Sequence, residues 1–230
     1  ICVGKTCTVS STTAGGIWVV DPSSTSMITV SGSGVVTGIG DGIATISYVA
    51  SGGTGCSISR TITVNPLPQP ITTASGIMRV CQGSTLKLDD VTLGGTWTVS
   101  PSAVASIVSS TGLLTGSVVV GSTTASTASV TYTLPTGCAI TAPVTVNPLP
   151  SPILGSNNVC QGAVTTVSVT ATPGGTWSSS NPLIASIGSA TGVITGGPGF
   201  GPGVIITYTL PTTCMRTMNI TVNPAPAAIV

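Results

Sequence analysis

Cysteine is the residue type with the most chemical potential in this 230-residue chain, which contains seven cysteines and no histidine. Three of them, here called the start cysteines, are spaced by 79 residues: Cys2, Cys81 and Cys160. Three others, the end cysteines, follow 54, 57 and 54 residues later: Cys56, Cys138 and Cys214. The chain has no Cys-x-x-Cys spacing, so a zinc site or a redox pair does not fit. The equivalent positions instead predict one disulfide within each of three repeats.

The predicted pairs are Cys2–Cys56, Cys81–Cys138 and Cys160–Cys214. Each pair would close a loop of about 55 residues and stabilise a small fold by about 4 kcal/mol on chain-entropy arguments. Disulfides persist in oxidising compartments, so the pairs also predict an extracellular or cell-surface location. The alternative is that these cysteines remain free thiols inside the core, where cysteine packs as a small apolar residue.

Cys7 is the odd cysteine. It follows Cys2 by five residues and aligns with Leu86 of the second repeat, an inward-facing position. The simplest interpretation is a buried thiol that packs as a small apolar side chain. The alternatives are a covalent bond to another chain or an exchange of partners with Cys56.

The other chemistry-bearing residues do not form a catalytic site. The acidic residues number four, all of them aspartate, and no serine stands beside an activating base. Asp89 and Asp90 are the only adjacent carboxylates, and the other repeats have no counterpart of them, so a calcium site there is a minor alternative. The sequence therefore predicts no enzyme, no cofactor and no metal site.

Composition narrows the range of partners. Only 4% of the residues are charged and the net charge is +1, which argues against nucleic acid or anionic lipid as a partner. No apolar run approaches the length of a membrane-spanning helix, so membrane insertion is not expected. The chain begins at Ile1 without a signal peptide, which suggests either a processed mature protein or an excerpt of a longer one.

An internal repeat organises these residues. The pattern Gly-Gly-x-Trp ends at Trp18, Trp97 and Trp177, at intervals of 79 and 80 residues. A fixed period of this size indicates tandem modules. We expect module 1 at 1–67, module 2 at 68–149, module 3 at 150–223 and a C-terminal linker or orphan strand at 224–230.

Each module is predicted to be a small antiparallel β-sandwich. Abundant threonine, valine and isoleucine favour strands, and the 30 glycines and 17 prolines supply turns. In 128–134, apolar residues alternate with serine and threonine, as in a strand with one buried face. Six aromatic residues recur at equivalent inward positions and are expected in the three cores: Trp18, Trp97, Trp177, Tyr48, Tyr132 and Tyr208.

The repeated motifs resemble a known family. Gly-Gly-Thr-Trp-Ser-Ser-Ser-Asn-Pro at 174–182, Thr-Gly-Val-Ile-Thr-Gly at 191–196 and Ile-Thr-Tyr-Thr at 206–209 are similar to group 2 bacterial immunoglobulin-like domains. The Val-Cys-Gln-Gly and Val-Asn-Pro-Leu-Pro motifs resemble tandem repeats of long surface proteins in Bacteroidota. The resemblance implies three immunoglobulin-like sandwiches in an all-β array that belongs to a secreted adhesin, stalk or filament.

The linkers and ends raise the question of assembly. Proline-alternating linkers join the modules, and each continues into a lead-in segment, 71–80 or 153–159, before the next start cysteine. In the resembled fold this lead-in segment is the first strand. Module 1 lacks it, whereas the chain ends with a similar segment that is a candidate subunit-joining strand: Ala227, Ala228, Ile229 and Val230. Either that strand completes module 1 of another copy, or the chain is a window from a longer covalent array.

These observations predict a structural protein of the bacterial cell surface whose partners are other copies of itself or neighbouring repeats. The alternative is an adhesive module that binds carbohydrate or another surface, with surface glycans as partners. Its binding loops would be 38–42, 117–126 and 196–203, which differ most between the modules.

Overall fold

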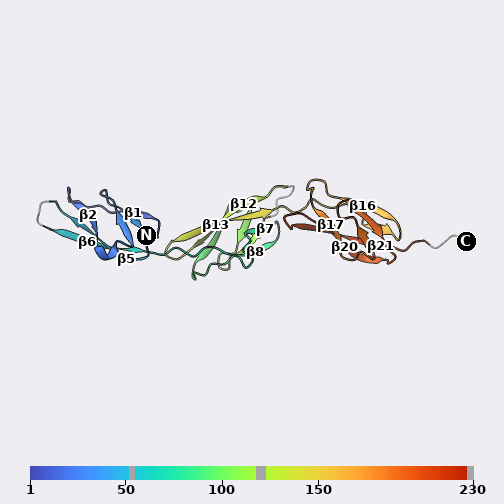
Figure 1. Cartoon of the computed structure of the whole chain (residues 1–230), viewed down its shortest axis with the longest axis horizontal. Coiled ribbons are helices and arrows are strands. Elements are labelled where there is room, and N and C mark those ends of the chain that lie inside the picture. The colour runs from blue at the N-terminus through green and yellow to red at the C-terminus, as the bar shows by residue number, and fades with distance from the viewer. Residues whose placement is uncertain (52–54, 118–122, 227–230) are drawn as a thin grey trace.

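The computed structural model describes residues 1–51, 55–117 and 123–226, and it shows three β-rich modules arranged in a line (Figure 1). The N-terminus lies at the end of module 1 that faces module 2, and residues 224–226 lead away from the far end of module 3. No helix among the described residues is long and apolar enough to cross a membrane.

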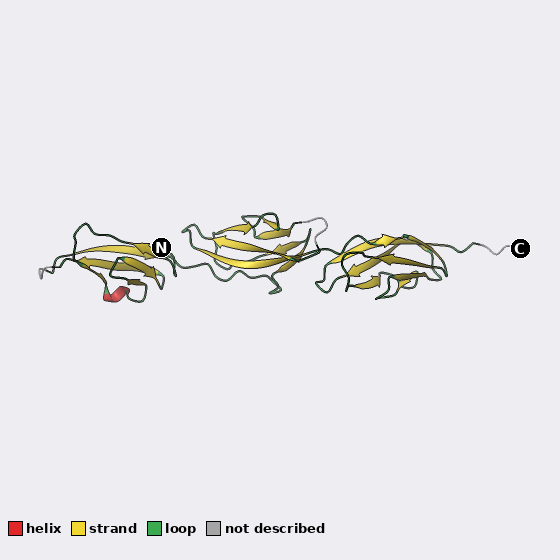
Figure 2. Cartoon of the chain, turned by 90° about the horizontal axis from the view of Figure 1, so that it is seen from above, coloured by secondary structure: helices red, strands yellow, loops and turns green. Residues whose placement is uncertain are grey.

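The described residues of module 1 form six strands and one short 3₁₀ helix, which is red in Figure 2. They are β1 (Thr6–Thr8), β2 (Ile17–Val20), η1 (Pro22–Ser24), β3 (Ile28–Val30), β4 (Val35–Gly38), β5 (Gly42–Val49) and β6 (Ser57–Val64). The strands form two three-stranded sheets with the orders β1-β4-β3 and β2-β5-β6.

Module 2 repeats this plan and adds one strand. Its strands are β7 (Arg79–Cys81), β8 (Thr85–Lys87), β9 (Thr96–Ser100), β10 (Ala105–Ile107), β11 (Leu113–Gly116), β12 (Ser126–Thr133) and β13 (Ala139–Asn147). The sheets have the orders β10-β11-β8 and β7-β13-β12-β9.

Module 3 adds two strands to the plan of module 1. Its strands are β14 (Leu154–Gly155), β15 (Asn158–Cys160), β16 (Val164–Ser168), β17 (Thr176–Ser179), β18 (Ala185–Ile187), β19 (Val193–Gly196), β20 (Gly201–Thr209) and β21 (Met215–Asn223). The sheets have the orders β14-β16-β19-β18 and β15-β21-β20-β17.

The fold class expected from the sequence is confirmed: the chain is all-β, in three immunoglobulin-like sandwich modules. Among the described residues the pairing is antiparallel except at the start of each module. There β7 runs parallel to β13 and β15 runs parallel to β21, and in module 1 Cys2 forms an isolated parallel bridge with Asn65. This parallel pair places the start cysteine beside the last residue of the final strand, Cys81 beside Asn147. Pro143 precedes the part of β13 that pairs with β7, so its missing N–H breaks no ladder on that side.

A tryptophan and a tyrosine form the centre of each module. In module 2, Trp97 and Tyr132 are 5% exposed, and their ring centroids lie 4.6 Å apart. The corresponding pairs are Trp177 with Tyr208 at 4.6 Å and Trp18 with Tyr48 at 4.7 Å. Offset aromatic contacts of this kind add about 1 kcal/mol to the burial of each pair.

The glycine pair before each tryptophan is explained by the tyrosine. In module 2, Gly94 has φ of +87°, and a Cβ on Gly95 would lie 2.5 Å from the ring of Tyr132. The Tyr132 hydroxyl accepts a hydrogen bond from the Gly95 N–H at 2.9 Å and donates one to the Thr92 carbonyl at 2.6 Å. The same hydroxyl geometry recurs in modules 1 and 3. The turn is therefore built around the tyrosine hydroxyl.

Candidate functional site

The junctions between modules contain both disulfides of the described residues. Cys2 of module 1 bonds Cys138 of module 2, and Cys81 of module 2 bonds Cys214 of module 3, with Cα atoms 5.6 Å apart in each pair. The pairs predicted within modules, Cys2–Cys56, Cys81–Cys138 and Cys160–Cys214, are therefore wrong. The bonds cross from each module to the next.

The geometry of the final strand explains the error. Cys81 lies beside Asn147 at the end of β13, whereas Cys138 immediately precedes the start of β13. Nine residues of extended strand separate these two poles by about 30 Å. A disulfide needs Cα atoms within about 7 Å, so a start cysteine cannot reach the end cysteine of its own module.

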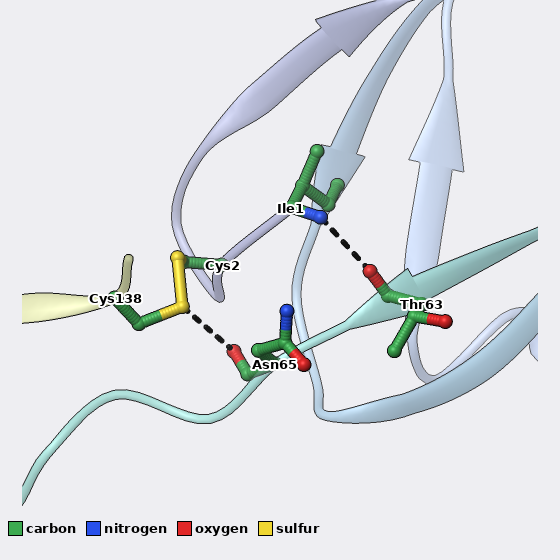
Figure 3. Close-up of a disulfide and its surroundings, with 5 residues drawn as sticks. All are labelled: Ile1, Cys2, Thr63, Asn65 and Cys138. Atoms are coloured by element: carbon green, nitrogen blue, oxygen red, sulfur yellow. Dashed lines mark hydrogen bonds between the residues drawn. A yellow bond between two sulfur atoms is a disulfide. The ribbon is translucent and has the colours of Figure 1, made fainter. Parts of the chain in front are cut away.

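The first junction brings the two poles of neighbouring modules together (Figure 3). The Ile1 ammonium group donates a hydrogen bond to the Thr63 carbonyl at 2.9 Å, which holds Cys2 at the end of β6. Cys138 is 1% exposed, and its Sγ lies 3.9 Å from the Asn65 carbonyl oxygen. This is a packing contact and not a hydrogen bond, because a disulfide sulfur carries no proton. The disulfide thus lies directly beside the linker.

The second junction also fixes the linker through polar contacts. Gln82 is 7% exposed, and its side-chain oxygen accepts a hydrogen bond from the Leu149 N–H at 3.5 Å. Arg216 of module 3 donates from Nε to the Pro150 carbonyl at 2.8 Å. The second linker is therefore held by the module that it leaves and by the module that it approaches, and a disulfide joins those two modules.

The remaining cysteines lie outside these two bonds. Cys160 and Cys56 are exposed, and Cys7 is half-buried against the core of module 1. Among the described residues the thiol of Cys160 takes part in no disulfide. Cys160 nevertheless has the backbone position of the bonded start cysteines, since it pairs with Asn223 as Cys81 pairs with Asn147.

Module 1 has an open groove. In modules 2 and 3 the corresponding place is occupied by the lead-in segment of the same module. The groove has a volume of about 850 Å³ and runs between β1 and β6, with Trp18, Ile46 and Tyr48 along its floor. Cys7 and Val9 line one side, and residues of β6 line the other. On β6, Ile58 is 74% exposed.

The lead-in segments occupy the corresponding places in the other modules. In module 2, Thr72 and Asp89 exchange two backbone hydrogen bonds of 2.9 Å, and Ile71 packs against the core. In module 3, β14 pairs with β16, and Ile153 packs against the core. In module 1 the residue equivalent to Asp89 is Ser10, and no strand among the described residues pairs with it.

Some core residues of module 1 are also less buried than the equivalent residues of modules 2 and 3. Leu88 and Val167, which lie under the lead-in segments, are 0% and 1% exposed, whereas the equivalent Val9 is only half-buried. Trp97 and Trp177 are buried, whereas Trp18 is half-buried. The predicted core residue Trp18 is therefore partly open to solvent through the groove.

The candidate subunit-joining strand, Ala227 to Val230, lies outside the described residues. Its sequence can still be aligned through the Asn-Pro pair that ends each module. Ile229 follows Asn223 by six residues, as Ile71 follows Asn65 and Ile153 follows Asn147. The residue that packs on the core in modules 2 and 3 thus has a counterpart at the C-terminal end.

The acidic residues show no ligand arrangement. Asp89 forms an ion pair with the Lys87 ammonium group at 2.6 Å. The Asp90 carboxylate accepts a hydrogen bond from the Thr92 N–H at 2.7 Å. Within the described ranges, no three potential metal ligands come together. The Ser23 hydroxyl and N–H donate hydrogen bonds to the Asp21 carboxylate and lower its pKa.

The loops of the alternative binding hypothesis are spread over three modules. In 196–203, Phe200 is 62% exposed, while 117–126 lies partly outside the described residues. The structure brings no further aromatic side chain to Phe200 among the residues that it describes.

Comparisons with known proteins give only distant structural similarities. No family model and no curated protein matches the sequence. The chain is similar to bacterial invasin, an integrin-binding protein, with a TM-score of 0.43 and 15% identity over 91% of this chain and 52% of that one. It is similar to the human desmocollin-1 ectodomain (TM-score 0.28, 12% identity, 93% and 52% covered) and to domains 1–6 of surface layer protein SbsC (0.30, 13%, 93% and 35%). The chain spans about half the length of the first two and about a third of the last. These similarities are too distant to transfer a partner or an assembly.

Two functional residues were missed by the sequence reasoning. Gln82 and Gln161 follow the start cysteines of modules 2 and 3, and each accepts a hydrogen bond from the linker that leaves its module. The repeated Cys-Gln-Gly motif carried this signal, because a buried glutamine amide requires a partner. Module 1 has Val3 at that position.

Proposed function

We propose that this chain is a structural subunit or segment of an extracellular bacterial filament, stalk or adhesin. It is extended by the addition of a lead-in strand to the groove of module 1. The strand is supplied by the C-terminal segment of another copy, and the contact is head to tail. The observation that carries the proposal is that groove, which lies where modules 2 and 3 hold their own lead-in segments.

The chemistry of the groove supports an extended apolar strand as the occupant. Trp18 and Ile46 form an apolar floor, and β1 has a free edge that ends beside Ser10. Strand addition satisfies such an edge with main-chain hydrogen bonds, while alternate side chains enter the apolar floor. Ile229 would enter as Ile71 and Ile153 do in their own modules.

The two junction disulfides support a mechanical role. Each adds a second covalent connection between neighbouring modules, beside a proline-rich linker that is stiff on its own. Disulfides also form and persist in oxidising compartments, which supports an extracellular location. A surface with few charges suits lateral contact with other copies or with the cell surface.

The proposed contact is open-ended. A groove at one end and a strand at the other are different surfaces, so each added copy leaves a new groove and a new strand. Contacts of this heterologous kind produce fibres unless the rotation closes a ring. The linear arrangement of the three modules favours a fibre (Figure 1).

The test replaces the anchor of the strand. The Ile229→Asp/Val230→Asp double variant should give folded monomers without fibres in electron microscopy, because a carboxylate cannot enter the apolar groove without a large desolvation cost. The matched control is Val91→Asp, a site that is 79% exposed and lies in module 2, which should still form fibres. Fibre growth by the double variant would refute strand addition. A native mass far above 22.3 kDa would instead place the missing strand upstream in a longer chain.

A further inference from the structure

The two disulfides follow one rule, in which the start cysteine of a module bonds the end cysteine of the next module. We propose that Cys160 of module 3 forms an intermolecular disulfide with Cys56 of a second copy of this chain. The proposal rests on the head-to-tail assembly described above and names the covalent bond that seals it. The disulfide would join the two copies covalently, through Cys160 of one and Cys56 of the other, in addition to the strand contact.

The backbone around Cys160 matches that of the bonded start cysteines. Cys2 accepts a hydrogen bond from the Lys5 N–H at 3.0 Å, and Cys81 accepts one from the Ser84 N–H at 3.0 Å. Cys160 accepts the equivalent bond from the Ala163 N–H, also at 3.0 Å. Three turns with the same backbone hydrogen bond therefore hold the start cysteines, and two of these cysteines are bonded to the following module.

The linker leaves module 3 as it leaves module 2. The Gln161 side-chain oxygen accepts a hydrogen bond from the Ala225 N–H at 3.0 Å, the counterpart of the bond between Gln82 and Leu149. The number of residues from Asn223 to Val230 is also the number from Asn147 to Leu154. Because the linker leaves both modules through the same contact, we expect the next module to lie at the same distance from the start cysteine.

The surface beside Cys160 has room for an incoming turn. A hollow of about 250 Å³ opens between Cys160, Val164 and Asn223. At the first junction the turn that precedes β13 lies at this position, and Cys138 in it is 1% exposed. Cys160 is exposed because its side chain is not covered by a neighbouring module, as the other two start cysteines are.

Cys56 occupies the matching turn in module 1. Its carbonyl accepts a hydrogen bond from the Ala50 N–H at 3.0 Å, just before the final strand of the module. Cys138 and Cys214 accept the equivalent bonds from Leu134 and Leu210 at 2.8 and 2.9 Å. All three end cysteines therefore accept one backbone hydrogen bond just before the final strand of their module, although the loop that leads to Cys56 is two residues longer. At both internal junctions the cysteine at this position forms a disulfide.

The bond requires an oxidant, for which a small disulfide of the glutathione class suffices. The thiolate of Cys160 attacks one sulfur of that disulfide and releases one small thiolate, which leaves a mixed disulfide on Cys160. The thiolate of Cys56 then attacks the Cys160 sulfur and releases the second small thiolate. Two protein thiols lose two protons and two electrons, and the small disulfide is reduced to two thiols.

The first experiment incubates the 230-residue protein with oxidised glutathione and separates it by non-reducing denaturing electrophoresis. We expect a ladder at multiples of 22.3 kDa that collapses to monomer with dithiothreitol. Cys160→Ser removes an exposed thiol and should abolish the ladder. Leu183→Ser, at a 78% exposed position of the same module, is the control and should retain it. A ladder that persists in Cys160→Ser would overturn the proposal.

A mixing experiment tests the pair itself. Cys160→Ser and Cys56→Ser should each remain monomeric alone, because each lacks one half of the bond. Mixed in equal amounts under oxidation, they should form dimers of twice 22.3 kDa and nothing longer, since both remaining ends carry serine. Monomers alone in the mixture, or dimers of either variant with itself, would contradict the assignment.

Electron microscopy of the same samples separates this proposal from strand addition. Fibres of the wild-type protein that fall apart to monomers in detergent would overturn the disulfide and leave the strand contact standing. The absence of both fibres and ladder would overturn the two together. Fibres from Cys160→Ser are expected, because the strand contact does not involve that thiol.

Discussion

Modules 1 and 2 share the same central motif and differ in how completely it is covered. Both have the Gly-Gly turn, the tyrosine hydroxyl contacts and the tilted tryptophan–tyrosine pair. Only module 2 has a lead-in segment over its core, and Trp97 is buried while Trp18 is half-buried. The aromatic motif therefore sets the shape of the sandwich, and the lead-in segment closes it.

This comparison connects folding to assembly. A module that carries its own lead-in segment is complete, whereas module 1 has an apolar groove of about 850 Å³. The same difference appears in the cysteines: the four at internal junctions are bonded, and Cys160 is exposed. The unfilled groove and the exposed start cysteine lie at opposite ends of the line of modules, as a head-to-tail contact requires.

The largest expected effect is on extensibility. With both disulfides, the shortest covalent path from end to end uses the 57 residues between Cys81 and Cys138 and the short terminal segments. At about 3.5 Å per residue, the fully unfolded chain should extend to about 260 Å oxidised and about 800 Å reduced. Single-molecule pulling with and without dithiothreitol measures this difference. An oxidised chain that extends as far as the reduced one would show that the junction bonds are absent.

The next largest effect is expected when the lead-in segment no longer covers the core of module 2. Ile71→Asp should destabilise that module by about 3 kcal/mol or more, because it places a charge against the core. It should also make Trp97 as accessible to a soluble quencher as Trp18. Calorimetry and fluorescence quenching measure the two changes. The matched control is Ile77→Asp in the same segment, where the side chain is 46% exposed, and a control effect as large would remove the special role of Ile71.

The two tryptophans should respond unequally to truncation. Trp97→Ala should cost about 3–5 kcal/mol, the usual range for a buried aromatic residue. Trp18→Ala should cost clearly less, because part of that ring already faces the groove. Hydrogen exchange resolved by module measures both free energies of unfolding in one protein. Equal costs would mean that the groove is closed in solution.

The smallest effect should be the same in both modules. Tyr132→Phe removes a hydroxyl that makes two hydrogen bonds, and it should cost about 1–2 kcal/mol. Tyr48→Phe removes the same pair of bonds in module 1 and should cost about as much. Thermal unfolding measured by near-ultraviolet circular dichroism checks this. A much smaller cost for Tyr48→Phe would show that the turn of module 1 also depends on the lead-in strand.

The features that could be predicted from the sequence are those that depend on contacts within one module, such as strand alternation and the aromatic pairs. The alternating residues 128–133 lie in β12, because a half-buried strand imposes a period of two, and 134 follows its end. The three aromatic pairs could be placed because each module has to fill the same interior. The parallel pairing of β7 with β13 was not predicted, since a three-residue strand leaves no clear alternation to identify it.

The disulfide partners could not be predicted from spacing alone. A period of 79 residues is equally compatible with bonds within a module and with bonds to the next one. The choice depends on the pole at which each cysteine lies, and that follows from the parallel strand that places Cys81 beside Asn147. The exposure of Trp18 was missed for a related reason, because the sequence marks the position as inward but does not show what covers it.

Peptide mapping of the oxidised protein by mass spectrometry, without reduction, tests the central claim most directly. We expect cross-linked peptides that contain Cys2 with Cys138 and Cys81 with Cys214, both of which disappear on reduction. Peptides that join Cys2 to Cys56, or Cys81 to Cys138, would place the bonds inside modules. That result would contradict the covalent coupling of neighbouring modules, on which the proposed bond between Cys160 and Cys56 depends.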